Sequence, residues 1–270
     1  MRLRTVDAFT DRPFNGNAAA VVVLDEAPPD DWMAALARET NLSDTAFVIR
    51  EHPSDADFRL RWFTPTVEVD LCGHATLAAA HCVFEDGANG PIRFSTRSGV
   101  LTVDQRRDGS LTMDLPPSPP APIDVPAGLP EALGAPVEWA GRSDNNFFVV
   151  ALLADEHSVR NLSPNIAGVA CIDSPGITVT ALAEPGQAYD FVFRVFAPDA
   201  GIDEDPVTGS AHAVLAPYWA DRLGRTSLVG LQASARSGLV GVELSGDRVL
   251  VIGRAVTVSD GVLRPAASPS

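Results

Sequence analysis

The chain has 270 residues, 46% of them hydrophobic and 20% charged, a globular composition that supplies apolar cores for one large or two medium domains. Its formal net charge of −15 argues against nucleic acid or an anionic membrane as a partner, because either would repel it. All 20 basic residues are arginine, so a lysine Schiff base with pyridoxal phosphate and the lysine of a Walker A loop are both excluded.

The three cysteines, Cys72, Cys82 and Cys171, form no disulfide framework, which suits a reducing compartment. Cys72 and Cys82 lack the second close pair that a structural zinc site uses, so no metal is expected. The first ten residues carry charged and polar groups where a signal peptide needs an apolar segment, and no apolar run has the length of a membrane span. These patterns predict a cytoplasmic protein without a membrane partner.

The first half of the chain reads as strands interrupted by two helices. Turn-forming residues over 10–17 separate the first two strands, and Asp30 and Asp31 are acids of the kind that open a helix. In chain order, the patterns predict strands over 2–8 and 18–24, a helix over 30–40, strands over 45–50 and 57–63, a helix over 73–84, and short strands over 92–94, 99–104 and 110–115.

The run Pro-Pro-Ser-Pro-Pro-Ala-Pro, residues 116–122, cannot continue a helix or a central strand. It is the best domain boundary in the chain. We therefore predict an N-terminal lobe over 1–117 and a C-terminal lobe over 118–270, with the last strand able to return to the N-terminal lobe.

The second half repeats motifs of the first half in the same order, at offsets of 133, 136 and 139 residues. Three matches in one order predict two similar α+β lobes with a cleft between them. The matched pairs are Arg61-Trp-Phe-Thr-Pro with Arg194-Val-Phe-Ala-Pro, Gly73-His-Ala-Thr-Leu-Ala-Ala-Ala with Gly209-Ser-Ala-His-Ala-Val-Leu-Ala, and Arg97-Ser-Gly-Val-Leu-Thr-Val with Arg236-Ser-Gly-Leu-Val-Gly-Val.

In each half, an extended segment runs through a proline and acidic residues into Gly73 or Gly209, where a helix is expected to begin. A helix N-terminus offers free backbone N–H groups and the positive end of the dipole, and glycine lets an anion approach that backbone closely. Two such starts facing one cleft would hold a small carboxylate without lysine. The alternative is a pair of ordinary strand-to-helix turns.

Four separated motifs, taken together and in order, resemble the PhzF-like proteins, a family named for the phenazine-biosynthesis isomerase and sharing the diaminopimelate epimerase fold. The resemblance covers nearly the whole chain. The motifs are Asp7-Ala-Phe-Thr with Phe14-Asn-Gly-Asn-Ala-Ala-Ala-Val-Val, Asn41-Leu-Ser-Asp-Thr-Ala-Phe, Phe63-Thr-Pro with Gly73-His-Ala-Thr-Leu, and Glu204-Asp-Pro-Val-Thr-Gly-Ser-Ala.

This resemblance implies two pseudo-symmetric lobes, each a sheet or barrel wrapped around a central helix. It also implies a homodimer, no metal and no organic cofactor, and a small carboxylate-bearing molecule as the substrate.

Carried over by position, the acid–base carboxylate of the family falls on Asp44, where the phenazine isomerase has glutamate. Aspartate is one methylene shorter, so its reach falls by about 1 Å. It can still act as a base, for a differently placed proton. The alternative reading is an Asx-type turn before a strand, since Asn-Leu-Ser-Asp is good turn chemistry.

Further residues match the substrate side of the family's site. His74 could orient a carboxylate or relay a proton, although a single histidine at a helix start is usually a cap or a surface residue. Asp205 and Ser210 match polar groups that hold the substrate, while Asp205 before Pro206 would equally suit a helix N-cap. Asn17 is a weaker candidate for the wall of the cleft.

Cys72 matches the first of the two cysteines that diaminopimelate epimerase and proline racemase use as a pair of bases. In the second lobe the alignment puts Pro206 at the position of the partner, and proline moves no protons. The two-cysteine mechanism therefore fails, and Cys72 is expected to be a small apolar residue lining the site.

Together these features predict a cofactor-independent isomerase that shifts a proton on a small carboxylate-bearing substrate, similar to trans-2,3-dihydro-3-hydroxyanthranilate, with Asp44 as the single acid–base group. Two rivals stay open. One is an amino-acid epimerase or racemase that pairs Asp44 with a second group such as His74. The other is a binding protein that kept the scaffold and lost the chemistry.

Overall fold

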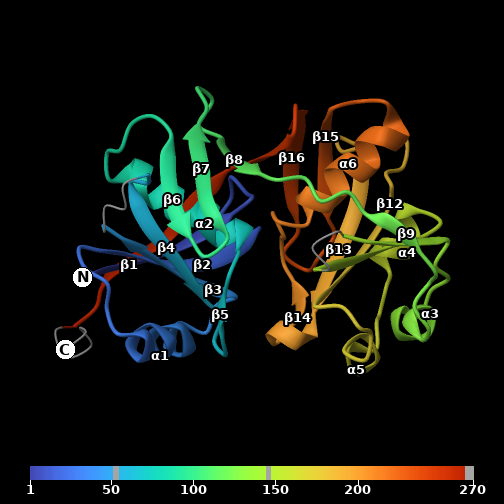
Figure 1. Ribbon diagram of the computed structural model, residues 1–270, viewed down its shortest axis with the longest axis horizontal. Helices are drawn as coiled ribbons and strands as arrows, with labels where there is room; N and C mark the ends of the chain where they lie inside the picture. The colour runs from blue at the N-terminus through green and yellow to red at the C-terminus, as the bar shows by residue number, and fades with distance from the viewer. Residues whose placement is uncertain (51–54, 144–146, 265–270) are drawn as a thin grey trace. The chain divides into compact units, whose positions relative to one another are not determined.

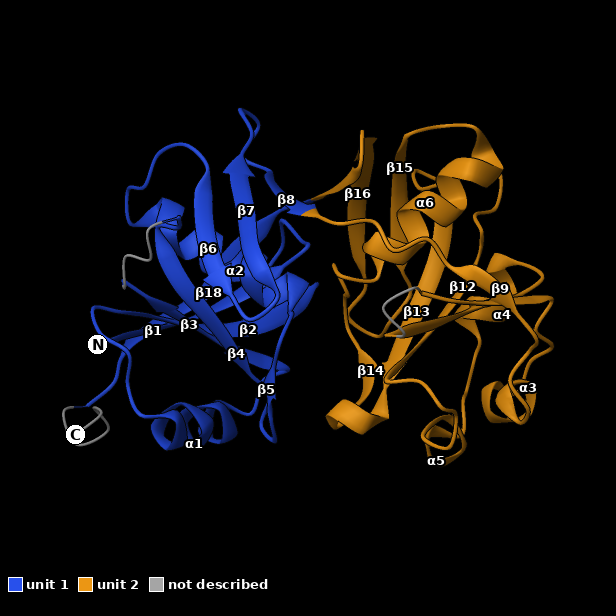
Figure 2. Cartoon of the chain, viewed as in Figure 1, with its two compact units in different colours: residues 1–114, 252–270 blue, residues 115–251 orange. Residues whose placement is uncertain are grey.

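The computed structural model describes residues 1–50, 55–143 and 147–264 as a mixed α/β chain with two compact units (Figure 1). Unit 1 comprises residues 1–114 and the C-terminal segment from 252, and unit 2 comprises residues 115–251 (Figure 2). The sequence pattern placed the division at 117/118. No described helix is long and apolar enough to cross a membrane.

The described part of unit 1 contains two helices, α1 (Asp30–Thr40) and α2 (Gly73–Glu85). Its strands are β1 (Arg2–Ala8), β2 (Asn17–Leu24), β3 (Asp44–Ile49), β4 (Phe58–Phe63), β5 (Glu68–Val69), β6 (Ile92–Thr96), β7 (Gly99–Gln105), β8 (Leu111–Leu115) and β18 (Ala255–Val262). Every element predicted in this half is confirmed to within two residues at each end. The strand β5 was not predicted, because two residues are too few to show a sequence period.

Three of the described helices of unit 2 have only four or five residues, and β8 and β17 run across the two boundaries between the units along the chain. Its helices are α3 (Leu129–Leu133), α4 (Glu156–Arg160), α5 (Ile166–Val169) and α6 (His212–Leu223), with the 3₁₀ turn η1 (Pro198–Ala200). Its strands are β9 (Ala121–Ile123), β10 (Trp139–Arg142), β11 (Phe148–Leu152), β12 (Gly176–Leu182), β13 (Phe191–Ala197), β14 (Ile202–Asp205), β15 (Ser227–Gln232), β16 (Gly238–Ser245) and β17 (Arg248–Gly253).

The strands of unit 1 pair in the order β18-β1-β2-β3-β4-β6-β7-β8. The β2–β3 and β4–β6 pairs are parallel and the others antiparallel, while β5 folds back on β4. C-terminal strand β18 therefore belongs to this unit, where it lies beside β1.

Unit 2 repeats this succession of pairings. β10 is antiparallel to β11, β11 is parallel to β12, and β12 is antiparallel to β13. β14 folds back on β13, β15 runs parallel to β13, and β16 returns antiparallel to β15. The motif repeat in the sequence is therefore a repeat of strand topology as well.

Helix α2 is the buried helix of unit 1. Ten of its 13 residues are buried, and it packs against β1, β2, β3, β7 and β18. Its sequence, Gly-His-Ala-Thr-Leu-Ala-Ala-Ala-His-Cys-Val-Phe-Glu, carries no acidic side chain on its first turn and no basic one on its last, and it is apolar around most of its circumference. A helix of this kind has to be covered on all sides, so the strands fix where it begins.

The corresponding helix of unit 2, α6, contains Pro217. Proline has no N–H to donate, so the Ala213 carbonyl loses its helical partner. The backbone N–H of Ser118 donates to that carbonyl instead, at 2.8 Å. The proline-rich run is thus fastened to the helix. Its strand β9 pairs with β10, as expected of an edge strand that contains proline.

An arginine–glutamate pair joins the long strand to the short strand in each unit. Arg61 on β4 donates from Nε and Nη2 to the two carboxylate oxygens of Glu68 on β5, both at 2.7 Å. Arg194 on β13 makes the same two-pronged contact with Glu204 on β14, at 2.7 and 2.8 Å. Hydrogen bonding to Glu68 raises the pKa of Arg61 above its ordinary value.

We expect Arg194→Met to lower the free energy of unfolding by about 2–3 kcal/mol, because it keeps the apolar stem and leaves Glu204 without this cation. Guanidinium denaturation of the full chain measures the change. Arg93→Met, at an exposed position of β6, is the matched control and should stay within about 0.5 kcal/mol of the parent. Equal guanidinium midpoints for Arg194→Met and Arg93→Met would contradict the structural role of the Arg194–Glu204 pair.

Candidate active site

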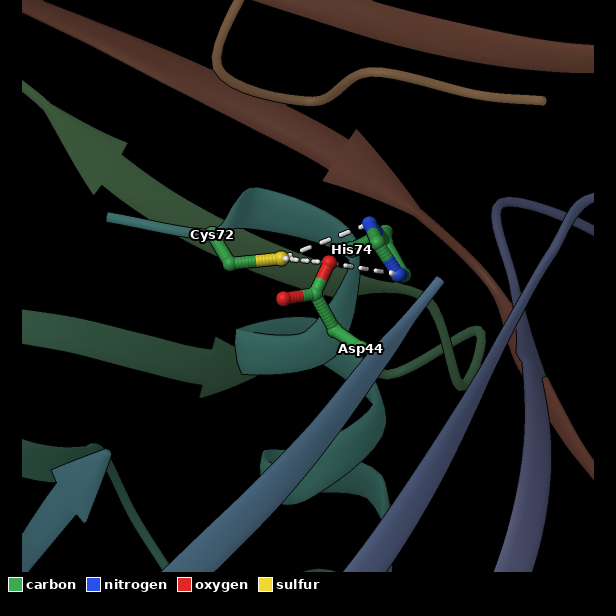
Figure 3. A group of neighbouring side chains, drawn as sticks. All are labelled: Asp44, Cys72 and His74. Carbon is green, nitrogen blue, oxygen red and sulfur yellow. Dashed lines mark hydrogen bonds and ion pairs between the residues drawn. The ribbon is translucent and has the colours of Figure 1, made fainter. Parts of the chain in front are cut away.

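Three side chains that the sequence singled out meet in unit 1 (Figure 3). Asp44 is the first residue of β3, Cys72 is the N-cap of α2, and His74 lies in the first turn of α2. The Cys72 thiol donates to Oδ2 of Asp44 at 3.2 Å, and its sulfur lies 3.4 Å from Nδ1 of His74. Nε2 of His74 is 3.7 Å from the same Oδ2 atom.

Local backbone structure explains why these residues meet. Helix α1 ends at Asn41, whose left-handed φ of 48° turns the chain so that β3 begins at Asp44. At the other side, Cys72 is extended, with φ −142° and ψ 110°. The Thr76 hydroxyl and the Thr76 N–H both donate to the Cys72 carbonyl, at 2.6 and 3.1 Å, and this holds the helix start.

The cluster is closed to solvent, with exposed fractions of 4% for Asp44, 7% for Cys72 and 3% for His74. Burial lowers the pKa of His74 to about 3, so the imidazole is neutral at physiological pH. Within the described residues, its Nε2 atom has no hydrogen-bond partner. His74 is therefore neither an ordinary cap nor a surface residue.

A carboxylate, a thiol and a neutral imidazole in contact can pass a proton among themselves. They are also three side chains of the kind that bind metal ions, with one ligand atom from each lying within 4.8 Å of the others. The sequence pattern did not predict that Asp44 meets the other two residues, because Asp44 lies on β3 and Cys72 and His74 lie at the start of α2.

The first turn of α2 offers a second feature. The side chain of the N-cap residue Cys72 makes no capping hydrogen bond, and the first turn contains no acidic side chain. The first backbone N–H groups of a helix have no helical acceptor. An anionic group of a ligand would be stabilised there by those N–H groups and by the helix dipole.

Asn17, the first residue of β2, is fully buried. Ala19 is the neighbour of Asp44 in the parallel β2–β3 register, so Asn17 lies on the same face of the sheet as Asp44. Gly16, directly before it, has a φ of +64°, and a Cβ atom there would lie 2.1 Å from the Ala8 carbonyl oxygen. Only glycine fits this approach to Asn17.

The candidates of unit 2 form a separate polar network. Asp205 ends β14 and accepts a hydrogen bond from the Thr208 hydroxyl at 2.5 Å. Gln232, at the end of β15, accepts from the Thr208 N–H and donates to the Asp205 carbonyl, both at 2.6 Å. The turn between Asp205 and Thr208 is thus attached to the sheet by one amide side chain.

The helix expected from Gly209 begins instead at His212. The N–H groups of His212 and Ala213 bond the carbonyls of Gly209 and Ser210, three residues back, so a tight turn precedes the α-helix. Asp205 is consequently not the N-cap of α6, which corrects that alternative. Gly209 and Ser210 lie in the turn that leads into the helix.

Sequence reasoning missed Gln232 and Thr208. By strand register, the counterpart of Gln232 is Thr96, the last residue of β6, which carries no amide. The repeat therefore carried no signal for Gln232. Thr208 stands inside a quoted motif, but its contact with Asp205 depends on the turn that follows β14.

Residues 6–261 match the family model described as phenazine biosynthesis-like protein, PhzC-PhzF. The chain is 48% identical over 261 residues to a Pseudomonas aeruginosa protein named as an uncharacterized isomerase, covering 96% of each chain. A PhzF-family crystal structure from Enterococcus faecalis has a TM-score of 0.89 at 38% identity, with 96% of this chain and 97% of that one covered.

A more distant structure, of a probable proline racemase from Agrobacterium radiobacter, has a TM-score of 0.66 at 13% identity, covering 98% of this chain and 95% of that one. At this identity the likeness extends to the fold alone.

The lowered pKa of His74 predicts a loss of stability in acid. The unfolded chain protonates this side chain near pH 6.5 and the folded chain only near pH 3, so the stability is full above pH 6.5 and lost as the pH falls between these values. Between pH 6 and 4, the parent should lose about 1.4 kcal/mol per pH unit more than His74→Gln. His157→Gln, at an exposed histidine, should keep the parental slope. If the free energy of unfolding changed with pH equally in the parent and in His74→Gln, the buried, neutral state of His74 would be contradicted.

Gln232→Leu should lower the free energy of unfolding by about 2–3 kcal/mol, because the Thr208 N–H and the Asp205 carbonyl lose their partner inside the protein. Gln105→Leu, at the exposed end of β7, is the matched control and should be nearly neutral. Thermal unfolding of both variants measures the difference. A neutral Gln232→Leu would mean that the turn does not depend on this side chain.

Proposed function

Since this chain belongs to the PhzC-PhzF family of phenazine biosynthesis-like proteins, we propose that it is an isomerase that shifts a proton on a small carboxylate-bearing substrate. Asp44 is the acid–base group in this proposal. The observation that carries it is the position of the Asp44 carboxylate, which is 4% exposed and in contact with the Cys72 thiol at the start of a buried helix.

The substrate class is a cyclic dihydroaromatic acid similar to trans-2,3-dihydro-3-hydroxyanthranilate. The Asp44 carboxylate takes a proton from one ring carbon, and the C–H electron pair moves into the conjugated system. The same carboxyl group then returns the proton to a carbon further along that system. Atoms and electrons balance within the substrate, so the reaction needs no oxidant, reductant or second substrate.

Charge that develops during this shift spreads towards the substrate carboxylate. The backbone N–H groups at the start of α2 would stabilise this negative charge, since they are fixed in direction and the Cys72 side chain does not cap them. Neutral His74 serves as a hydrogen-bonding partner that adds no charge of its own. Gly73 keeps the approach to these groups free of a side chain.

The remaining candidates have supporting roles in the proposal. Asn17 lies on the Asp44 face of the sheet, while Asp205, Gly209 and Ser210 are assigned to substrate binding through the turn that Gln232 holds. The proposal also includes a fold of two pseudo-symmetric lobes, a homodimer and chemistry without an organic cofactor.

The geometry of unit 1 favours isomerisation over epimerisation. Two bases that invert a carbon have to reach it from opposite faces. Asp44, Cys72 and His74 lie only 3.2–3.7 Å from one another, so they approach any substrate carbon from the same side. Removal and return of the proton on one face moves a double bond and does not invert a stereocentre.

The test is deuterium incorporation from heavy water into a panel of amino acids and dihydroaromatic acids, with double-bond position and stereochemistry both scored. Asp44→Asn should lower the exchange rate on the order of 100- to 10,000-fold and keep ligand affinity within about tenfold, since the amide preserves the shape. Asp44→Glu should remain active. Cys72→Ala should cost far less than Asp44→Asn.

Three results would count against the proposal. An active Asp44→Asn with an inactive Cys72→Ala would make the thiol the base. Exchange with inversion and an unmoved double bond would favour the epimerase. Tight ligand binding with neither deuterium exchange nor a shifted double bond in the parent protein would favour a binding protein on the same scaffold.

A further inference from the structure

We propose that Asp44, Cys72 and His74 form a binding site for a thiophilic divalent cation, with Zn²⁺ as the best-suited ion, and that the bound cation inhibits the enzyme. The binding part depends on the geometry of the cluster alone. The inhibition part rests on the proposed function, because it requires Asp44 to be the acid–base group.

One ligand atom from each of the three side chains lies within 4.8 Å of the others, and the printed spacings are near those of a tetrahedral ion. Zinc bond lengths of about 2.0 Å to oxygen and nitrogen and about 2.3 Å to sulfur put the ligand atoms about 3.3–3.5 Å apart. Cys72 Sγ and Asp44 Oδ2 are 3.2 Å apart, and His74 Nε2 and Asp44 Oδ2 are 3.7 Å apart. These two spacings differ from the tetrahedral values by a few tenths of an ångström, and the sulfur lies 3.4 Å from Nδ1 of the same imidazole.

A second observation points to a ligand at this place. The imidazole of His74 is 3% exposed, and its Nε2 atom makes no hydrogen bond to any residue in the described part of the chain. A buried nitrogen normally has a partner. Figure 3 shows the imidazole directed at the carboxylate, so an ion between the two would supply one.

The chemistry of the three groups selects among metal ions. Magnesium and calcium prefer oxygen ligands, whereas a thiolate, an imidazole and a carboxylate together suit zinc and the softer transition metals. Three protein ligands leave one position of a tetrahedral ion for water. The sequence predicts no metal, because Cys72 and Cys82 lack a second close pair. In the structure, the ligands come from β3 and the start of α2.

Binding exchanges a proton for the ion. The S–H bond of Cys72 breaks, the sulfur–zinc bond forms with the sulfur electron pair, and the proton passes to the buffer, with no change of oxidation state. The Asp44 carboxylate becomes a ligand at the same time. It can then no longer take a proton from carbon, so occupancy stops the isomerase reaction.

Titration of the chelator-treated full chain with Zn²⁺ by calorimetry, and with Co²⁺ by near-ultraviolet absorption, tests the site. We expect one site per chain and a thiolate-to-cobalt charge-transfer band. Removing a partner that only orients a ligand weakens metal binding roughly 10- to 100-fold, so Cys72→Ser and His74→Gln should each weaken it at least about tenfold. Cys171→Ser, at the exposed cysteine, is the control and should bind as the parent does.

The thiolate-to-cobalt charge-transfer band of the parent protein decides whether the site exists, even if a variant fails to fold. Its absence, or its loss in Cys171→Ser, would overturn the site. Deuterium exchange by the parent should fall with Zn²⁺, recover with chelator and be unaffected by Mg²⁺. If the parent protein binds zinc at the cluster but catalyses no exchange, the metal site is supported and the proposed function is rejected. Exchange unaffected by bound zinc would reject the inhibition.

Discussion

The two-pronged contact between an arginine and a glutamate is the interaction on which both candidate regions depend. In unit 1, Arg61 holds the two-residue strand β5, and the chain leaves β5 directly towards Cys72. In unit 2, Arg194 holds β14, which ends at Asp205. A strand this short has few backbone hydrogen bonds, so a planar guanidinium that grips both carboxylate oxygens supplies the missing constraint. The lysine-free composition is consistent with this use of arginine.

The position of the cluster of Asp44, Cys72 and His74 follows from that constraint. With β5 fixed and α2 enclosed by strands, the start of the helix lies opposite the first residue of β3. Asp44, Cys72 and His74 then meet in a place that water hardly reaches. Burial keeps the imidazole neutral, and the close spacing puts all three groups on one side of any bound carbon. One-sided proton transfer is the natural chemistry of such a cluster.

Much of this could be predicted from the sequence where local pattern decides. The amphipathic α1, the apolar α2 and most strands of unit 1 follow from spacing and turn residues, and the family inferred from four motifs is confirmed by the match over residues 6–261. Asp44, Cys72 and His74 were each identified, yet their contact was not, because strand pairing between distant segments decides it. Gln232 gave no signal at all, since its role depends on a turn 24 residues earlier. The late start of α6 reflects tight-turn hydrogen bonds that helical periodicity does not record.

The central claim, that one buried carboxylate both removes and returns the proton, is tested most directly by a single turnover in heavy water. Because Asp44 is only 4% exposed, its captured proton should exchange slowly with solvent. With an excess of enzyme over a substrate that the exchange screen identifies, the first product formed should retain a measurable share of the original protium at its new carbon. Complete deuteration of that carbon in the first turnover would contradict a single shielded base and indicate a second proton donor.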